Sequence, residues 1–173
     1  SVFDMLPEQA SQAEEILHFW FEECAPWQWF RRCDAFDRSV SERFGQLTEA
    51  AQQGQLIEWE VDQSSALALI LLLDQFSRNI WRGQARAYQG DLHAQRLSQL
   101  ALKQQWLERE PEKSRRQFWL MPLLHSECLE RVNQVIPLLE HWVDGETADV
   151  ARRNRKMLLK HGRYPWRDEV LGR

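Results

Sequence analysis

Residues 66–83 read ALALILLLDQFSRNIWRG, an apolar run followed directly by charged and amide side chains. The first eight residues are apolar almost all round a helix, so we expect this helix to be the central and most buried one. Asp74, Gln75, Arg78 and Asn79 come next. Such groups beside a core are costly unless each has a hydrogen-bonding partner. The stretch therefore predicts either a satisfied internal network or the wall of a pocket for a polar ligand.

Most of the chain shows the apolar spacing of amphipathic helices. No segment alternates with a period of two for long enough to form a strand, and no repeat of fixed length is visible. We expect an all-α fold of about seven helices joined by short loops, with residues 1–173 forming one domain. The expected helices are 7–21, 36–51, 62–81, 91–106, 113–121, one that begins at Pro122 and buries residues up to Leu139, and a last one that ends at His161.

Short motifs indicate where several helices begin and end. Ser11-x-x-Glu14 has the pattern of a capping box for the first helix. Asp91 is expected to cap the helix that follows it. Pro122 is tolerated in a first helical turn, so a new helix is expected to begin there. Gly162 is placed to end the last long helix, because glycine readily adopts the left-handed conformation.

The composition indicates a packed domain. Hydrophobic residues make up 43% of the chain and charged residues 28%, so long disorder is not expected. We interpret the nine Trp and eight Phe mainly as core bulk between helices. The net charge of −4 gives no general attraction for nucleic acid. The apolar run is far shorter than the roughly 20 residues of a membrane span, so no membrane partner is expected.

The cysteines and the first residues indicate a cellular compartment. Cys24, Cys33 and Cys128 are odd in number and show no CxxC spacing. They predict buried thiols in a reducing compartment, and neither a disulfide framework nor a zinc site. Residues 1–10 are polar and acidic, unlike a signal peptide. We therefore expect a cytoplasmic protein.

Arginines are in excess after the central apolar run. Asp74 and Arg78 are four residues apart and can pair on one helix face. Arg82 and Arg86 add two guanidinium groups that Asp74 cannot also neutralise. These groups need a distant carboxylate, solvent or a bound anion, and arginine suits two-pronged contacts with phosphate or carboxylate. The block predicts either structural ion pairs or an anion site.

A second polar block, His125-Ser126-Glu127, follows the apolar residues 118–124. We expect His125 just inside a helix and near the core, as a structural residue or a general base. Residues two apart do not face each other on a helix, so Glu127 is better placed for Arg131, and Asp74 is a candidate partner for His125. These side chains lack the spacing of a metal site, and no phosphate loop or serine nucleophile elbow is present.

The third polar block is residues 161–173, HGRYPWRDEVLGR. Arg163 and Arg167 are separated by aromatic residues, which can hold guanidinium planes by stacking. The alternative is a tail that seals the core with Tyr164 and Trp166 and leaves both arginines in water.

These three blocks, in the same order, resemble a bacterial family catalogued as domain of unknown function 924. The matching residues are 73–88, 122–127 and 162–173, with further matches in 19–37. The resemblance implies an all-helical, tetratricopeptide-like superhelical domain and no established activity. Ser77 stands where the family usually has proline, and Trp166 where it usually has histidine. The family commonly continues past Arg173 with an acidic helical segment, which would form a wall of the pocket.

Three functions remain open at this point. The leading hypothesis is a binding domain for an anionic small molecule or an acidic peptide. The second is a hydrolase or transferase for an anionic substrate, with His125 as general base and Asp74 or Glu127 orienting it. The third is a tetratricopeptide-like interaction module with purely structural polar motifs. Neither a cofactor nor an oligomeric state is indicated. In the leading hypothesis the ligand is held on one concave face by Arg78, Arg82, Arg86, Arg163 and Arg167, with His125 and Glu127.

Overall fold

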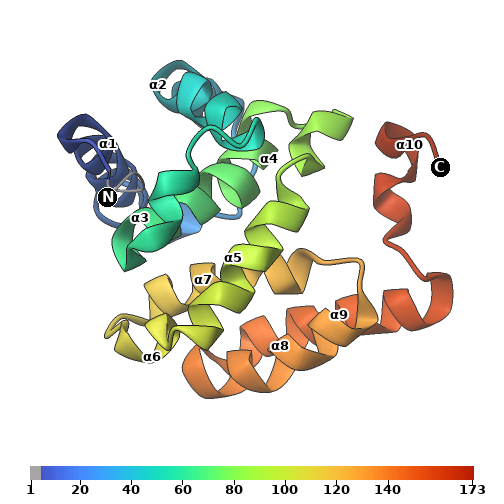
Figure 1. The fold of residues 1–173 in the computed structure, drawn as a ribbon. Coiled ribbons are helices and arrows are strands. Elements are labelled where there is room, and N and C mark those ends of the chain that lie inside the picture. The colour runs from blue at the N-terminus through green and yellow to red at the C-terminus, as the bar shows by residue number, and fades with distance from the viewer. Residues whose placement is uncertain (1–4) are drawn as a thin grey trace.

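The computed structural model describes residues 5–173, where all regular structure is helical (Figure 1). Seven α-helices in this range have eight residues or more, which confirms the all-α prediction. Their tetratricopeptide-like arrangement stays a prediction. The α-helices are α1 (Pro7–His18), α2 (Asp34–Gln52), α3 (Gln63–Ile70), α4 (Ser77–Ile80), α5 (Asp91–Lys103), α6 (Trp106–Arg109), α7 (Lys113–His125), α8 (Leu129–Trp142), α9 (Gly145–His161) and α10 (Asp168–Leu171).

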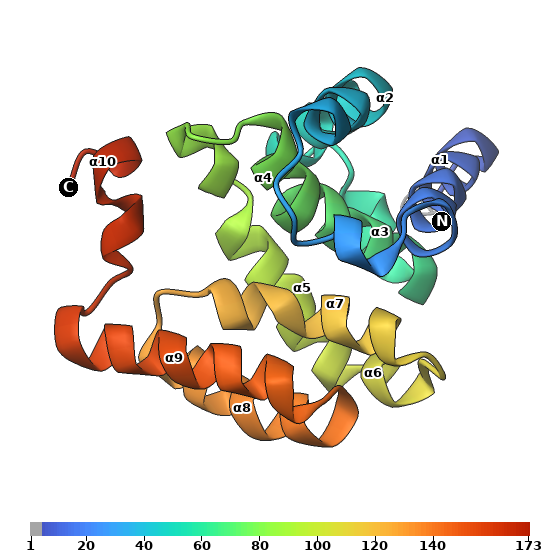
Figure 2. The same cartoon turned by 180° about the vertical axis from the view of Figure 1, so that it is seen from behind.

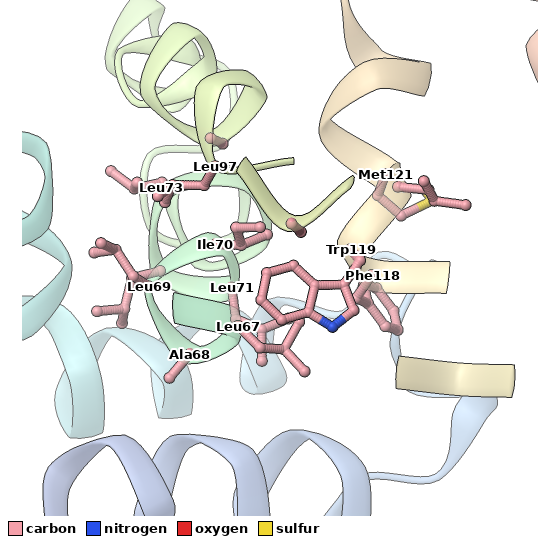
Figure 3. Close-up of a cluster of buried hydrophobic side chains, with 14 of the residues drawn as sticks. Leu67, Ala68, Leu69, Ile70, Leu71, Leu73, Leu97, Phe118, Trp119 and Met121 are labelled. Atoms are coloured by element: carbon pink, nitrogen blue, oxygen red, sulfur yellow. The ribbon is translucent and has the colours of Figure 1, made fainter. Parts of the chain in front are cut away.

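The central helix lies where the sequence predicted it. α3, a π-helical segment (Leu71–Phe76) and α4 follow one another without a break, and every side chain in 65–77 is buried. This segment packs against α1, α2, α5 and α7. Figure 3 shows its leucines gathered with Leu97 of α5 and Trp119 of α7. The core is therefore built around the apolar run.

The central helix widens where it becomes polar. Residues Leu71–Phe76 form a π-helical segment, and the hydroxyl of Ser77, which follows it, donates a hydrogen bond to the carbonyl oxygen of Leu72 at 2.9 Å. π-helical turns are rare and often occur at functional sites. Asp74 lies in this turn and is 1% exposed.

One helix, and not two, leads to His125. α7 continues through Pro122, and α8 begins only at Leu129, so the predicted helix start at Pro122 is wrong. Proline removes one helical hydrogen bond, but residues 118–124 are all buried, and their packing on both sides maintains the helix. His125 is consequently the last residue of α7, and residues 126–128 form the connection to α8.

Two predicted helix caps are wrong, although both helices begin at the predicted residues. α1 begins at Pro7, so Ser11 lies inside the helix and does not cap it. Asp91 is the first residue of α5, but its carboxylate binds the guanidinium of Arg78 instead of a helix N–H. α5 ends at Lys103 and does not continue to residue 106. At Asp91 a contact with the central helix thus replaces the predicted local cap.

Gly90 allows α5 to begin directly against the central helix. A Cβ atom at position 90 would lie 2.7 Å from the carbonyl oxygen of Leu73 and 3.1 Å from its Cα. These are backbone atoms of a buried helix and cannot easily move away. We expect Gly90→Ala to lower the free energy of unfolding by about 1–3 kcal/mol, measured by chemical denaturation.

Gly45→Ala in α2 is the matched control for this substitution. Its new Cβ would meet only the Ser41 hydroxyl, at 3.8 Å. Alanine is a better helix former than glycine, so stability should stay the same or rise by up to about 1 kcal/mol. Equal effects of the two substitutions would show that Gly90 is not a point of close approach.

Candidate functional site

The three polar blocks of the sequence meet where the central helix, α7 and the C-terminal segment come together. The Nδ1 atom of His125 lies 2.9 and 3.0 Å from the two carboxylate oxygens of Asp74. The Arg167 Nη2 atom donates a hydrogen bond to the carbonyl oxygen of His125 at 2.8 Å. Residues 74, 125 and 167 are thus neighbours in space, although they are far apart along the chain.

Asp74 is a buried carboxylate with several donors around it. It also accepts hydrogen bonds from Gln75 at 3.0 Å and from Arg78 at 3.1 Å. Burial raises the pKa of Asp74, but His125 and Arg78 outweigh burial and hold this pKa below its ordinary value. An ionised carboxylate only accepts hydrogen bonds, so the proton between the two groups lies on the Nδ1 atom of His125.

Arg78 is fully compensated by carboxylates. Besides Asp74, it binds Asp91 in a two-pronged contact at 2.8 and 3.0 Å. Burial lowers the pKa of Arg78, but the two carboxylates outweigh it and raise the pKa above its ordinary value. Burial raises the pKa of Asp91. Arg78 therefore joins the central helix to the start of α5.

Arg167 lacks comparable compensation. The residue is 7% exposed, and its nearest carboxylate oxygens, on Asp91 and Glu127, are 3.9 Å away. Its Nε atom is buried without a hydrogen-bond partner. The guanidinium lies over the rings of Tyr88 and Tyr164, 4.5 and 4.9 Å from their centres. Burial, with the nearby charge of Arg78, lowers the pKa of Arg167.

Glu127 anchors the C-terminal segment. It accepts a hydrogen bond from the backbone N–H of Tyr164 at 2.8 Å and a two-pronged contact from Arg173 at 2.9 Å. Burial raises the pKa of Glu127, but these donors outweigh it and lower the pKa. Arg131 instead donates to Gln95, so the predicted Glu127–Arg131 pair is wrong. Of the two predicted partners for His125, Asp74 is the one beside it.

The other three predicted arginines lie elsewhere, so the expected convergence of five arginines is wrong. α4 ends at Ile80, and the four-residue helical spacing no longer relates the later arginines to Arg78. Gly162, with φ of +70°, ends α9 as predicted and turns the chain before the third arginine. Each has its own partner: Arg82 pairs with Asp37 at 2.7 Å, Arg86 with Glu49 at 3.2 Å, and Arg163 with Asp168 at 2.9 Å.

A cavity of about 960 Å³ lies beside the polar network that Asp74, Arg78, Asp91, His125 and Arg167 form. Arg78, His125 and Arg167 line it, whereas the carboxylates of Asp74 and Asp91 do not. The Nε2 atom of His125 has no hydrogen-bond partner among residues 5–173, and it is not fully buried. This end of the cavity therefore presents two guanidinium groups and an imidazole to a ligand.

Aromatic side chains form much of the remaining wall. They come from the segment before α2, the stretch between α4 and α5, and the C-terminal segment, which Figure 2 shows as separate parts of the fold. Polar and charged side chains also line the cavity away from Arg167, namely Lys113, Ser114, Gln117, Asp144, Glu146, Thr147 and Asn154. A cavity of this size, with aromatic and polar groups on its wall, is large enough for a small molecule. The aromatic residues of the wall are Phe21, Trp29, Phe30, Tyr88, Tyr164 and Trp166.

Comparison with known proteins identifies the family. A family model described as "Bacterial protein of unknown function (DUF924)" matches residues 16–173. The chain belongs to the DUF924 family. A solved structure, the protein of unknown function ATU0120 from Agrobacterium tumefaciens, is 31% identical with a TM-score of 0.88. The match covers 95% of the present chain and 92% of that chain. A search of the curated proteins finds no match.

The remaining predictions for this DUF924 chain concern cysteines, metals and membranes. Cys24 is buried, which raises its pKa to about 11, and Cys128 is half-buried. Cys33 is exposed, so the prediction of buried thiols is wrong for it. Within residues 5–173, no three His, Cys, Asp or Glu side chains are grouped to hold a metal ion. No helix in the same range combines the length and apolarity needed to cross a bilayer.

The sequence carries no clear signal for three residues at this site. Asp91 has the pattern of a helix cap, and neither Tyr88 nor Arg173 stands in a pattern that indicates its contact. Asp91 follows Arg78 by 13 residues, a spacing at which no local rule predicts a contact. The only signal was the excess of arginine itself, which required carboxylates from elsewhere.

Proposed function

We propose that this DUF924 protein binds a small anionic molecule in the cavity, with the anionic group held by Arg167, Arg78 and His125. The observation that supports it most is the state of Arg167. Its guanidinium is buried, donates to a neutral carbonyl oxygen and makes no hydrogen bond to a carboxylate among the described residues. A phosphate or carboxylate oxygen would supply the missing acceptor.

A purely structural role explains this arginine poorly. A buried charge without a close partner usually costs stability, and an apolar side chain of similar volume would fill the space at less cost. Arg78 also faces the cavity, but it has two carboxylate partners, so its burial needs no ligand to explain it. Groups whose charge is poorly satisfied in a cleft are candidates for ligand contact.

Titration calorimetry with phosphate, carboxylates, nucleotides and an acidic peptide tests the proposal. The substitution is Arg167→Met, which removes the charge but keeps much of the volume. We expect it to weaken anion binding about tenfold to a hundredfold, the usual loss for a hydrogen bond to a charged group. Arg163→Met is the control, because Arg163 is exposed and paired with Asp168. Equal affinities of the parent and Arg167→Met would contradict the proposal.

A second candidate function, acid–base catalysis on an anionic substrate, is favoured by the Asp74–His125 pair. Asp74 fixes the ring of His125 through Nδ1, and Nε2 is left to accept a proton from water or from a substrate hydroxyl. Arg167 and Arg78 lie close enough to the cavity to stabilise developing negative charge. This arrangement suits a hydrolase or transferase.

An activity screen with phosphate and carboxylate esters tests this second candidate. If His125 is a general base, His125→Gln should lower any turnover found by about 10²- to 10⁴-fold. His161→Gln is the control, since His161 lies at the end of α9 and does not line the cavity. The same turnover in the parent and in His125→Gln would remove the catalytic hypothesis.

A further inference from the structure

The cavity is much larger than a simple inorganic anion requires. Its volume of about 960 Å³ is that of a site for a drug-sized molecule. Arg78, His125 and Arg167 contact only one part of it, and the rest of the wall is rich in aromatic side chains. A ligand that fills the site therefore has, besides its anionic group, a larger part that contacts the rest of the wall.

One aromatic surface lies directly beside Arg167. Trp166 stacks on Tyr164 with ring centres 4.8 Å apart and planes at 9°, yet Trp166 remains 58% exposed. Arg167 in turn lies over the Tyr164 ring. The stacking holds Trp166 in position without covering it. A ring attached to an anion at Arg167 by a short linker would be within reach of this surface.

A second aromatic surface comes from the segment before α2. Phe30 stacks on the buried Phe118 with ring centres 5.9 Å apart and planes at 17°, but is itself 57% exposed. Trp29 also packs on Phe118, and its Nε1 atom donates to the carbonyl oxygen of Trp20 at 2.9 Å. Both rings line the cavity. Large exposed aromatic groups at a cavity are typical of a binding surface.

We infer that the ligand is a planar aromatic ring joined to one anionic group, with the ring on Trp166 or Phe30 and the anion at Arg167. The inference rests on the proposed anion binding and adds the chemical nature of the rest of the ligand. Aromatic rings attract other planar rings in offset-stacked or edge-to-face contacts. This attraction adds to the free energy gained from the area that the rings bury. A single incompletely compensated arginine suits one carboxylate or phosphate, and both kinds of anion share this chemistry.

Matched pairs of probes test the inference by titration calorimetry. The carboxylate pair is 3-phenylpropionate and 3-cyclohexylpropionate, which differ in the planarity of the ring. The phosphate pair is adenosine 5′-monophosphate and ribose 5-phosphate. We expect the planar member of at least one pair to bind about tenfold more tightly, and the favoured pair then identifies the anion.

Two variants assign this preference to the aromatic surfaces. The double substitution Phe30→Ala and Trp166→Ala should abolish the preference and leave weak binding that still depends on Arg167. Trp27→Ala is the control, because Trp27 is 62% exposed but does not line the cavity. Binding that depends on Arg167 without any preference for the planar member would overturn this inference and leave the proposed function standing. No binding that depends on Arg167 would overturn both.

Discussion

Replacement of Arg78 by alanine is expected to lower the free energy of unfolding by about 3–5 kcal/mol, as is usual when one member of a buried ion pair is removed. The substitution would leave Asp74 and Asp91 buried without the guanidinium between them. His125 would still contact Asp74, but among residues 5–173 Asp91 would keep only Arg167 as a charged partner, at 3.9 Å. Chemical denaturation measures the effect.

Arg82→Ala is the control for this prediction. Arg82 is the same residue type four positions on, and its side chain is partly exposed beside Asp37. Ion pairs of this kind contribute about 0–1 kcal/mol. If both substitutions cost less than about 1 kcal/mol, Arg78 is not the structural centre of the network. A large loss for Arg78 alone assigns it to stability, and leaves ligand binding to be tested at Arg167.

Trp119→Ala is expected to have a similarly large effect, about 3–5 kcal/mol. Trp119 is 1% exposed and lies in the core beside Phe118 and the central helix (Figure 3). Its Nε1 atom also donates to the carboxylate of Glu110 at 3.1 Å. Truncation would leave a cavity and remove a donor from a buried acid. Thermal or chemical denaturation measures the loss.

Trp166→Ala is the matched control in this case. Trp166 is mostly exposed and contributes to the cavity wall, so its loss should cost at most about 0.5 kcal/mol. A large loss at Trp166 would mean that this ring seals the fold and is not free for a ligand. A small loss at Trp119 would contradict its place in the core.

The sequence predicted the main helices because their signals are local. The apolar run before Asp74 predicted the central helix, and the amphipathic spacing of residues 36–51 predicted α2, which the structure extends by two residues at its start and by one at its end. The continuation of α7 through Pro122 was missed, since packing and not the proline decided it. The spacing of apolar residues predicts where helices form, but it does not show whether packing allows a helix to continue through a proline.

The site was predictable only in part, because its charges find partners across the fold. Asp74 was a candidate partner for His125, and the structure brings them together over 51 residues. The partners of Arg82 and Arg86 lie on α2, which helical spacing could not reveal. An excess of arginine in a sequence shows that partners are needed, and tertiary packing decides which arginine is left without one.

Arg167 is the arginine of the site whose charge, in the proposed function, is left for a ligand. Anomalous diffraction from crystals of the parent protein soaked in selenate, an oxyanion with a strong anomalous signal, measures this directly. We expect a selenate oxygen about 3 Å from the guanidinium of Arg167, inside the cavity. Selenate on exposed arginines of α9 such as Arg153, with none at Arg167, would contradict anion binding at Arg167.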